Sequence, residues 1–171
     1  MSNFHTVRKA ASDKIPTPRY TDVLVKADGR IPNIIDDIEL ALREGVSQQL
    51  TEFSKDFPPT RAGMQKLWTW MKRYITYNED GEAAQIIQEP ARLNQTRRGD
   101  CKSFSLFIAS VILCHKKPVS LMYVHYPDTY SNHVYPIAHF REGEVIVDAV
   151  WKRFDEQKEP FELIKEQLFK I

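Results

Sequence analysis

The chain has 171 residues, of which 42% are hydrophobic and 27% charged, and its formal net charge is +1. This length and apolar content favour one globular domain with a real core and exclude global disorder. The near-neutral charge excludes the strong basic excess of a dedicated nucleic-acid binder. No run approaches the roughly 20 apolar residues that span a bilayer. The first residues also lack the apolar stretch of a secretory signal, so we expect no signal peptide.

The first third of the chain divides into an arm and a helical region. Residues 1–30 carry scattered charge, two prolines and little periodicity, so we expect an extended or poorly ordered arm before a single domain over 31–171. From 33 to 53 apolar side chains recur about every four positions, which predicts a long amphipathic helix. Asn33 is suited to cap it, and Gly45 to break or bend it.

A second amphipathic helix is predicted from Thr60, its candidate cap, to about residue 75. Trp68 lies on the apolar stripe and Trp70 falls off it. Core packing is the favoured role for both indoles, more so for Trp68, with a ligand platform as the alternative. The stretch 82–96 has few periodic signals, which favours a loop with a short helical turn.

Residues 102–115 are apolar on nearly every side of a predicted helix, which places this helix in the middle of the core. Asp100 is its expected cap. Cys101 then falls in the first turn, where unpaired N–H groups and the positive end of the helix dipole stabilise a thiolate. Because the charge of Asp100 opposes that thiolate, we expect Arg97 or Arg98 to pair with it.

Beyond the central helix the pattern becomes that of strands. Residues 119–126, 133–140 and 144–151 are rich in β-branched and aromatic side chains, and Pro136 indicates an edge or a bulge. A final helix is predicted over 160–169. Helices followed by antiparallel strands packed on a central helix make an α+β fold.

The two cysteines, Cys101 and Cys114, lie thirteen positions apart on the predicted central helix. That spacing separates them by about 19 Å at 1.5 Å per residue. A disulfide needs Cα atoms within about 7 Å, so the two thiols cannot pair within the chain. Two free thiols are typical of a reducing compartment, and we expect the cytoplasm.

A hairpin turn near residues 140–143 would bring two polar side chains together. In that register the numbers of facing residues sum to 283, so Asp148 lies opposite Tyr135. His133 and Asp148 then share a face as diagonal neighbours, about 7–8 Å apart at Cα. An imidazole and a carboxylate can bridge that gap, unless a bulge at Pro136 changes the register.

These residues fit nucleophilic catalysis on a carbonyl carbon. Cys101 would be the nucleophile, His133 the general base and acid, and Asp148 the group that orients the imidazole and stabilises its cationic form. The Cys101 backbone N–H would donate to the oxyanion, with Gln95 as one candidate for a second donor.

Each residue also has a plain structural explanation. Cys101 can serve as a small hydrophobe, and His133 can bond a backbone carbonyl. Asp148 is harder to explain in this way, because a carboxylate in an apolar strand costs several kcal/mol unless it is paired. Zinc binding is the competing use of these residue types, although they lack the usual ligand spacings. Its candidate ligands are Cys101, His115, His125, His133 and His139.

Three segments carry a family resemblance: Gly99-Asp100-Cys101 opening an apolar helix, His133-Val134-Tyr135 on a strand, and Ile146-Val147-Asp148 on the next. In this order they resemble the transglutaminase-like superfamily, whose members share the papain-like cysteine peptidase fold and a Cys-His-Asp triad. Residues 70–80 and 88–90 are similar to the segment before the nucleophile in short bacterial and bacteriophage members. The likeness covers roughly residues 34–155.

The resemblance implies a single transglutaminase-like domain in which N-terminal helices and a central buried helix pack on an antiparallel sheet. It implies a Cys101–His133–Asp148 triad that hydrolyses an amide, or transfers its acyl group, through a thioester. No cofactor is expected. The expected partner is a protein or peptide substrate, with neither nucleic acid nor membrane, and the oligomeric state stays open.

Two positions depart from the family pattern. Ser103 stands where an acidic residue is common, and Ala149 stands where proline often follows the triad aspartate. Neither change removes a reacting group, so they bear on substrate class and activity level more than on fold. A catalytically silent binding or structural module, such as a phage-associated one, is the alternative function.

Overall fold

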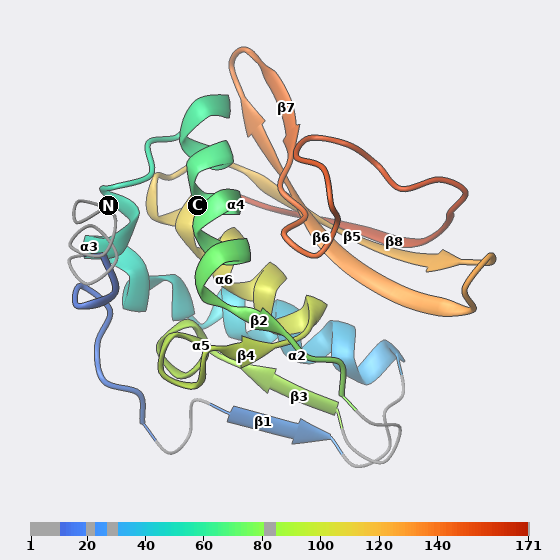
Figure 1. The fold of residues 1–171 in the computed structure, drawn as a ribbon, viewed down its shortest axis with the longest axis horizontal. Helices are drawn as coiled ribbons and strands as arrows, with labels where there is room; N and C mark the ends of the chain where they lie inside the picture. The colour runs from blue at the N-terminus through green and yellow to red at the C-terminus, as the bar shows by residue number, and fades with distance from the viewer. Residues whose placement is uncertain (1–10, 20–22, 27–30, 81–84, 171) are drawn as a thin grey trace.

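One buried helix, α6 (Cys101–Cys114), lies at the centre of the fold. We describe a computed structural model, which covers residues 11–19, 23–26, 31–80 and 85–170. Every α6 side chain from residue 102 to 113 is buried, as its all-round apolar sequence predicts. Figure 1 shows α6 crossing the middle of the molecule between the main sheet and the other helices.

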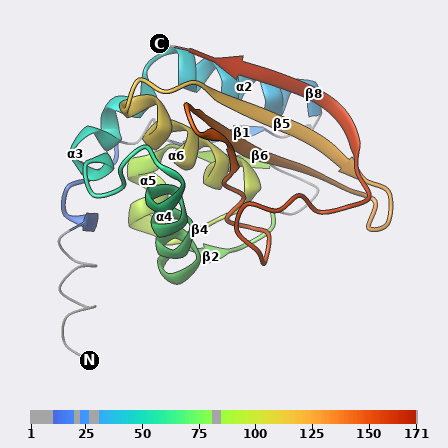
Figure 2. The ribbon, with the colours of Figure 1, turned by 90° about the horizontal axis from the view of Figure 1, so that it is seen from above.

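The main sheet covers one side of α6. Within the described residues it has four antiparallel strands in the order β7-β6-β5-β8. Figure 2 shows β5 and β6 on one side of α6 and helices α4 and α5 on the other. The strand bounds are β5 (Val119–Tyr126), β6 (Ser131–Phe140), β7 (Gly143–Ile146) and β8 (Glu162–Phe169).

Two expectations for this region were wrong. The third predicted strand ends at Ile146 and does not reach 151. The predicted helix over 160–169 is instead strand β8, which pairs antiparallel with β5. Its Glu, Leu, Lys and Gln residues are good helix formers, but pairing along an open sheet edge overrides that weak local preference.

Pro136 sits within β6 without a bulge toward β5, since the register of that pair is constant from Val119↔Ala138 to Tyr126↔Ser131. On the other side of β6, the ladder with β7 ends at Ile137↔Ile146, immediately before the proline. One residue further along, the Val147 N–H still donates to the Pro136 carbonyl at 3.0 Å, so the missing N–H of Pro136 falls at the end of the β6–β7 pairing, where the proline accepts a hydrogen bond but cannot donate one.

The other helices pack around the rest of α6. They are α2 (Ile31–Arg43), a 3-10 helix η1 (Val46–Leu50), α3 (Thr51–Ser54), α4 (Arg61–Tyr74) and α5 (Pro90–Thr96). One of them, α2, also contacts β8 through the Glu39–Lys165 ion pair at 2.6 Å. Gly45 breaks the first helical region as expected, with a φ of +84° that glycine adopts without strain. The helix begins at Ile31, so Asn33 is not its cap. Thr60 does cap α4, accepting from the backbone N–H of Gly63.

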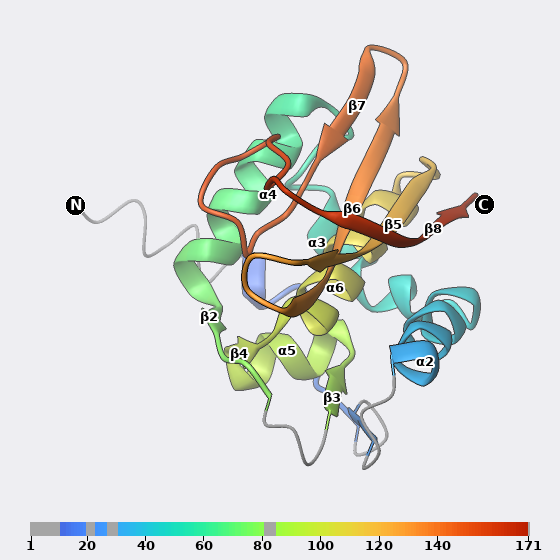
Figure 3. The same cartoon turned by 90° about the vertical axis from the view of Figure 1, so that its right-hand side faces the viewer.

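Two short strand pairs complete the fold: β1 (Val23–Lys26) with β3 (Gln85–Gln88), and β2 (Thr76–Tyr77) with β4 (Arg98–Gly99). The expectation of a loop over 82–96 was therefore incomplete, because β3 and α5 lie within it. Figure 3 shows β2 and β4 near the end of the segment that leads into α6.

Most of the expected N-terminal arm is outside the described residues. The parts that are described contact the domain: Ala11 and Ile15 are buried in the main core, and β1 pairs with β3. No helix within the described residues is long and apolar enough to cross a membrane.

Both tryptophans of α4 pack against the core, as expected, but the order of their burial is the reverse of the predicted one. Trp70 is the more buried, 6% exposed, with its ring stacked on Phe107 at 5.8 Å between centroids. Trp68 is only partly buried against the core, and its indole N–H donates to the Asp148 carbonyl at 2.7 Å. The periodic pattern identified the apolar face of α4. It did not show that two different segments of the chain pack against the helix.

Candidate active site

Cys101 is the first residue of α6, and the chain reaches it through a short parallel strand pair. The Asn78 N–H donates to the Gly99 carbonyl at 2.9 Å, which ties β2 to β4 just before the helix. Asp100 is the N-cap, as expected, and its Oδ1 accepts from the Lys102 backbone N–H at 3.0 Å. The half-buried Cys101 side chain thus lies where the helix N-terminus stabilises negative charge.

The charge of Asp100 is balanced by a lysine rather than by the arginines we expected. The buried Lys102 ammonium pairs with Asp100, lies 3.2 Å from Asp80 Oδ2 and donates to Gln85 Oε1 at 2.9 Å. Burial lowers the pKa of Lys102, and the charge of Asp80 opposes that change. Because Lys102 neutralises Asp100, the carboxylate beside Cys101 opposes a thiolate less than it would alone.

His133 and Asp148 form a direct buried contact. The imidazole Nε2 lies 2.7 Å from Asp148 Oδ2, and the two side chains are 9% and 7% exposed. The predicted β6–β7 register holds, since Ile137↔Ile146 and Phe140↔Gly143 each sum to 283. Asp148 itself lies beyond the end of β7, so the prediction that it lies on a strand was wrong. The prediction that it neighbours His133 was right.

Burial lowers the pKa of His133, but the hydrogen bond and negative charge of Asp148 outweigh it, with a further contribution from hydrogen bonding to Cys101. Together they raise the pKa to about 10. The pKa of His133 rises because the imidazolium form is stabilised by the Asp148 carboxylate on one side and by the Cys101 sulfur on the other. Because Nε2 is taken by Asp148, Nδ1 is the ring nitrogen that can exchange a proton with the Cys101 sulfur.

Backbone donors complete the surroundings of the Asp148 carboxylate. Its Oδ1 accepts from the N–H groups of Val150 and Trp151 at 2.9 and 3.2 Å. One oxygen is therefore held by the local turn and the other faces His133, which fixes the carboxylate in a single orientation.

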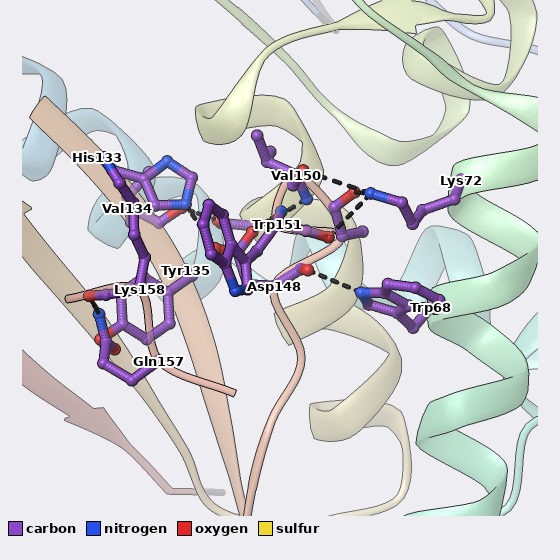
Figure 4. Close-up of polar contacts among 12 residues, drawn as sticks. Trp68, Lys72, His133, Val134, Tyr135, Asp148, Val150, Trp151, Gln157 and Lys158 are labelled. Atoms are coloured by element: carbon purple, nitrogen blue, oxygen red, sulfur yellow. Dashed lines mark hydrogen bonds and ion pairs between the residues drawn. The ribbon is translucent and has the colours of Figure 1, made fainter. Parts of the chain in front are cut away.

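Helix α4 holds the segment that carries Asp148 (Figure 4). Lys72 Nζ donates to the carbonyl oxygens of residues 149, 150 and 151 at 3.2, 3.3 and 2.8 Å. One turn earlier on α4, Trp68 donates to the Asp148 carbonyl, and the Lys72 ammonium lies 5.1 Å from the Trp68 ring centroid. This lysine and tryptophan were not predicted as site residues, and their spacing of four along one helix face was the available signal.

Two tyrosines flank the His133 ring. Tyr126 and Tyr135 each have ring centroids 5.7 Å from that of the imidazole. The Tyr135 hydroxyl donates to Gln157, and the Lys158 ammonium lies 4.0 Å from the Tyr126 ring centroid. These contacts limit rotation of the imidazole and exclude water from it.

A cavity of about 300 Å³ opens beside Cys101 and His133. Asp148 does not line it and lies behind the imidazole. Gln95 does not line it either: its side chain is exposed and accepts from Arg92 at 2.8 Å, so the suggested second oxyanion donor was wrong. The other lining residues are Ile34, Ile35, Tyr77, Glu79, Asp80, Gln85, Asp100, Lys102, Tyr123, Tyr130, Ser131, Asn132, Val134 and Ile164.

The candidate zinc ligands do not converge. His115 Nε2 contacts the backbone carbonyls of Ser54 and Phe57, and His125 contacts the Asn132 side chain. His139 lies between Ser120 and Glu144. Among the residues that the structure describes, no group of three His, Cys, Asp or Glu side chains is placed to hold a metal ion.

Solved structures share this arrangement of elements. LapG from Legionella pneumophila superposes with a TM-score of 0.53 at 14% identity, over 80% of this chain and 87% of LapG. EGTA-treated LapG gives a TM-score of 0.53 at 13% identity, over 80% and 84%. A candidate cysteine protease from Cytophaga hutchinsonii gives a TM-score of 0.50 at 14% identity over 74% of this chain and 48% of that one. This chain therefore spans about half the length of the Cytophaga protein.

No family model and no curated protein matches the sequence. The structural likeness nevertheless confirms the fold class expected from the sequence: an α+β fold of the transglutaminase-like, papain-like cysteine protease type. The bacteriophage type stays a prediction.

Proposed function

We propose that the protein is a cysteine-dependent hydrolase or acyltransferase that acts on an amide through a thioester intermediate. The observation that carries this proposal is the placement of Cys101, His133 and Asp148. A thiol at a helix N-terminus meets an imidazole whose far nitrogen is bonded to a buried carboxylate. LapG and the Cytophaga protein support a protein or peptide as the substrate.

Each step has an assigned proton donor and acceptor. The Cys101 thiolate attacks the carbonyl carbon, and the electron pair of the C=O bond moves onto oxygen. As the C–N bond breaks, the His133 imidazolium gives its Nδ1 proton to the departing amine, which leaves a thioester. His133 then takes a proton from water or from a second amine, which attacks the thioester and releases Cys101 as the thiolate.

Two donors are available for the oxyanion. The N–H of Cys101 belongs to the first turn of α6, where helical N–H groups have no partner within the helix. The Tyr77 hydroxyl is the second donor. Tyr77 lines the cavity, and its strand pairs with Gly99, two residues before the nucleophile. Burial, and next the charge of Cys101, raise the pKa of Tyr77, so its phenol keeps the proton it donates.

Selective alkylation tests the proposal. Iodoacetamide should label Cys101 near pH 6, because His133 holds the thiolate as an ion pair. Burial raises the pKa of the Cys114 thiol, so Cys114 should stay unlabelled and serves as the internal control. Mass spectrometry identifies the modified residue. Labelling of Cys101 that begins only near pH 8.5, the ordinary thiol pKa, would support the catalytically silent module instead.

A Cys101→Ala variant separates chemistry from packing. Its side chain is only partly buried, so we expect the unfolding midpoint to stay near that of the unmodified protein while labelling by acyl electrophiles disappears. A large loss of stability would mark Cys101 as a packing residue.

A further inference from the structure

Strand β8 is the open edge of the main sheet. It pairs with β5 on one side, and within the described residues no strand pairs with it on the other. Figure 2 shows β8 outermost in the sheet, beyond β5 and β6. Three of its apolar side chains are exposed: Leu163 is 55%, Ile164 43% and Leu168 42% exposed. An open edge with exposed apolar side chains can accept an added strand.

The backbone of β8 offers hydrogen-bonding groups along this edge. The Pro136 carbonyl accepts a hydrogen bond on the β7 side, so the backbone groups of Leu121, its β5 partner, point toward β8. This direction alternates along an antiparallel strand. Gln167, opposite Leu121, therefore points toward β5, whereas Glu166 and Leu168 point outward. The Gln167 side-chain amide donates to the Leu168 carbonyl at 3.1 Å, in keeping with that direction. The edge thus presents the N–H groups of Glu166 and Leu168.

A β-bulge connects this edge to the candidate active site. The β5–β8 register shifts at Ile164, which is the extra residue between Leu163 and Lys165. Ile164 lines the cavity that also contains Cys101. An antiparallel partner of β8 would run from Leu168 toward Ile164, so its C-terminal end would reach this cavity.

The charges of β8 determine which strand fits its edge. The two exposed leucines and Glu166 share one face of β8, because the bulge shifts the alternation of side chains. Glu166 accepts a hydrogen bond from Ser120 at 2.9 Å and forms no ion pair among the residues that the structure describes. Lys165 lies on the other face, where it pairs with Glu39 of α2. The face with the leucines therefore fits a strand with a basic side chain opposite Glu166 and apolar ones beside it.

A second copy of β8 fits this face less well. Pairing about a twofold axis with Leu163 opposite Leu168 places Glu166 opposite the same residue of the other copy. Like charges directly opposite each other destabilise a strand pair. Charge therefore favours a different chain, with a cation at the central position.

We propose that β8 binds an extended segment of the substrate as an added antiparallel strand. This segment precedes the carbonyl group attacked by Cys101 and carries apolar, basic and apolar residues at alternate positions. Its backbone pairs with Glu166 and Leu168. This inference rests on the proposed function, because a strand on β8 directs a substrate to the cavity only if Cys101 reacts with it.

The test uses peptide acyloxymethyl ketones, from which the Cys101 thiolate displaces the carboxylate and forms a carbon–sulfur bond. The probe acetyl-Val-Thr-Lys-Glu-Val is followed by one to five glycines that carry the ketone, so that the series covers different spans of the cavity. Its lysine lies opposite Glu166, and its valines lie opposite Leu168 and Leu163. We expect the best probe to label Cys101 about 25-fold faster than the acetyl-glycyl ketone, since two ladder hydrogen bonds contribute about five-fold each.

N-methylation of the probe distinguishes strand pairing from other modes of binding. In the proposed register the backbone N–H of the probe lysine faces β8, whereas that of the preceding threonine faces away. Methylation of the lysine nitrogen should slow labelling about five-fold, and methylation of the threonine nitrogen should leave the rate unchanged. Equal effects at the two positions would contradict pairing along an edge.

A charge reversal assigns the binding to β8. In Glu166→Lys a probe with glutamate in place of its lysine should become the faster one, and each mismatch should slow labelling about three-fold, as for an exposed ion pair. Glu142→Lys makes the same change at an exposed position of the β6–β7 turn, at the opposite edge of the sheet, and should keep the preference for lysine. An unchanged preference in Glu166→Lys would overturn the inference.

The two proposals fail in different ways. If iodoacetamide labels Cys101 near pH 6 while no probe of the series reacts faster than the acetyl-glycyl ketone, the strand inference is wrong and the catalytic proposal stands. If the N–H groups of Glu166 and Leu168 are protected from hydrogen exchange in a dimer of the free protein, a second copy occupies the edge and the inference is also wrong. If neither reagent class prefers Cys101 over Cys114, the proposed function itself fails.

Discussion

His133 and Asp148 meet at 2.7 Å although they come from different kinds of structure, a sheet strand and the irregular segment after β7. The strand fixes the imidazole, while the carboxylate depends on contacts from outside the sheet. Helix α4 supplies those contacts through Trp68 and Lys72, so the proposed triad is held together by three separate parts of the fold.

The charge of Asp148 is expected to be essential. Asp148→Asn keeps the shape of the side chain but removes the anion that raises the pKa of His133. We expect labelling of Cys101 by acyl electrophiles to slow by about 10²- to 10³-fold, in the range of general acid–base effects. Asp128→Asn is one control, since Asp128 contacts the site only through Lys158, and Asp56→Asn is the remote control, because Asp56 pairs with Lys14 at 2.7 Å on a different part of the surface. Equal effects of Asp148→Asn and Asp56→Asn would contradict the assignment of Asp148.

The same pair predicts a pH dependence of stability. The pKa of His133 is about 10 in the folded protein, above its value of about 6.5 in an unfolded chain. Between these values the folded state binds the extra proton, so this contribution is fully present below pH 6.5 and is lost as pH rises through about 10. We expect the free energy of unfolding by urea to fall from pH 7 to pH 10. The fall should be smaller in His133→Asn, and identical slopes in the two proteins would argue against the ion pair.

Much of this site could be predicted from residues that are close in sequence or related by a strand register. The all-round apolar pattern identified α6, and a constant sum of residue numbers placed His133 beside Asp148. The contacts that the sequence did not show join distant segments: Lys72 reaches residues 149–151, and β8 pairs with β5. Local patterns carry no information about which distant segment covers a given face.

The error over the oxyanion donor has a similar cause. Gln95 was chosen because it is near Cys101 in sequence, but it lies on α5 with an exposed side chain. Tyr77 is more distant in sequence yet adjacent in space through the β2–β4 pair. A two-residue parallel pairing leaves almost no signal in a sequence, so Tyr77 could not be found by spacing.

Lys72 is expected to act by positioning Asp148. In Lys72→Met the three carbonyl contacts to residues 149–151 are lost, while the aliphatic packing of the side chain is largely kept. We expect acylation of Cys101 to slow about ten-fold, with faster hydrogen exchange at the N–H groups of Val150 and Trp151, which bond Asp148. Lys55→Met is the control, since Lys55 pairs with Glu52 on the surface at 2.6 Å. Slower acylation with unchanged exchange at Val150 and Trp151 would contradict a positioning role.

The Tyr77 hydroxyl can be tested by comparing two reactions of the same sulfur. Acylation of Cys101 by an activated ester passes through an oxyanion, whereas alkylation by iodoacetamide is a displacement at carbon and forms none. Tyr77→Phe should therefore slow acylation about a hundred-fold, as for loss of one oxyanion donor, and leave the alkylation rate and its pH profile unchanged. Tyr130→Phe is the control, because Tyr130 also lines the cavity but is 88% exposed. If Tyr77→Phe slows both reactions equally, the phenol acts on the thiolate or on the local structure; if it slows neither, the second donor must be another group on the cavity wall.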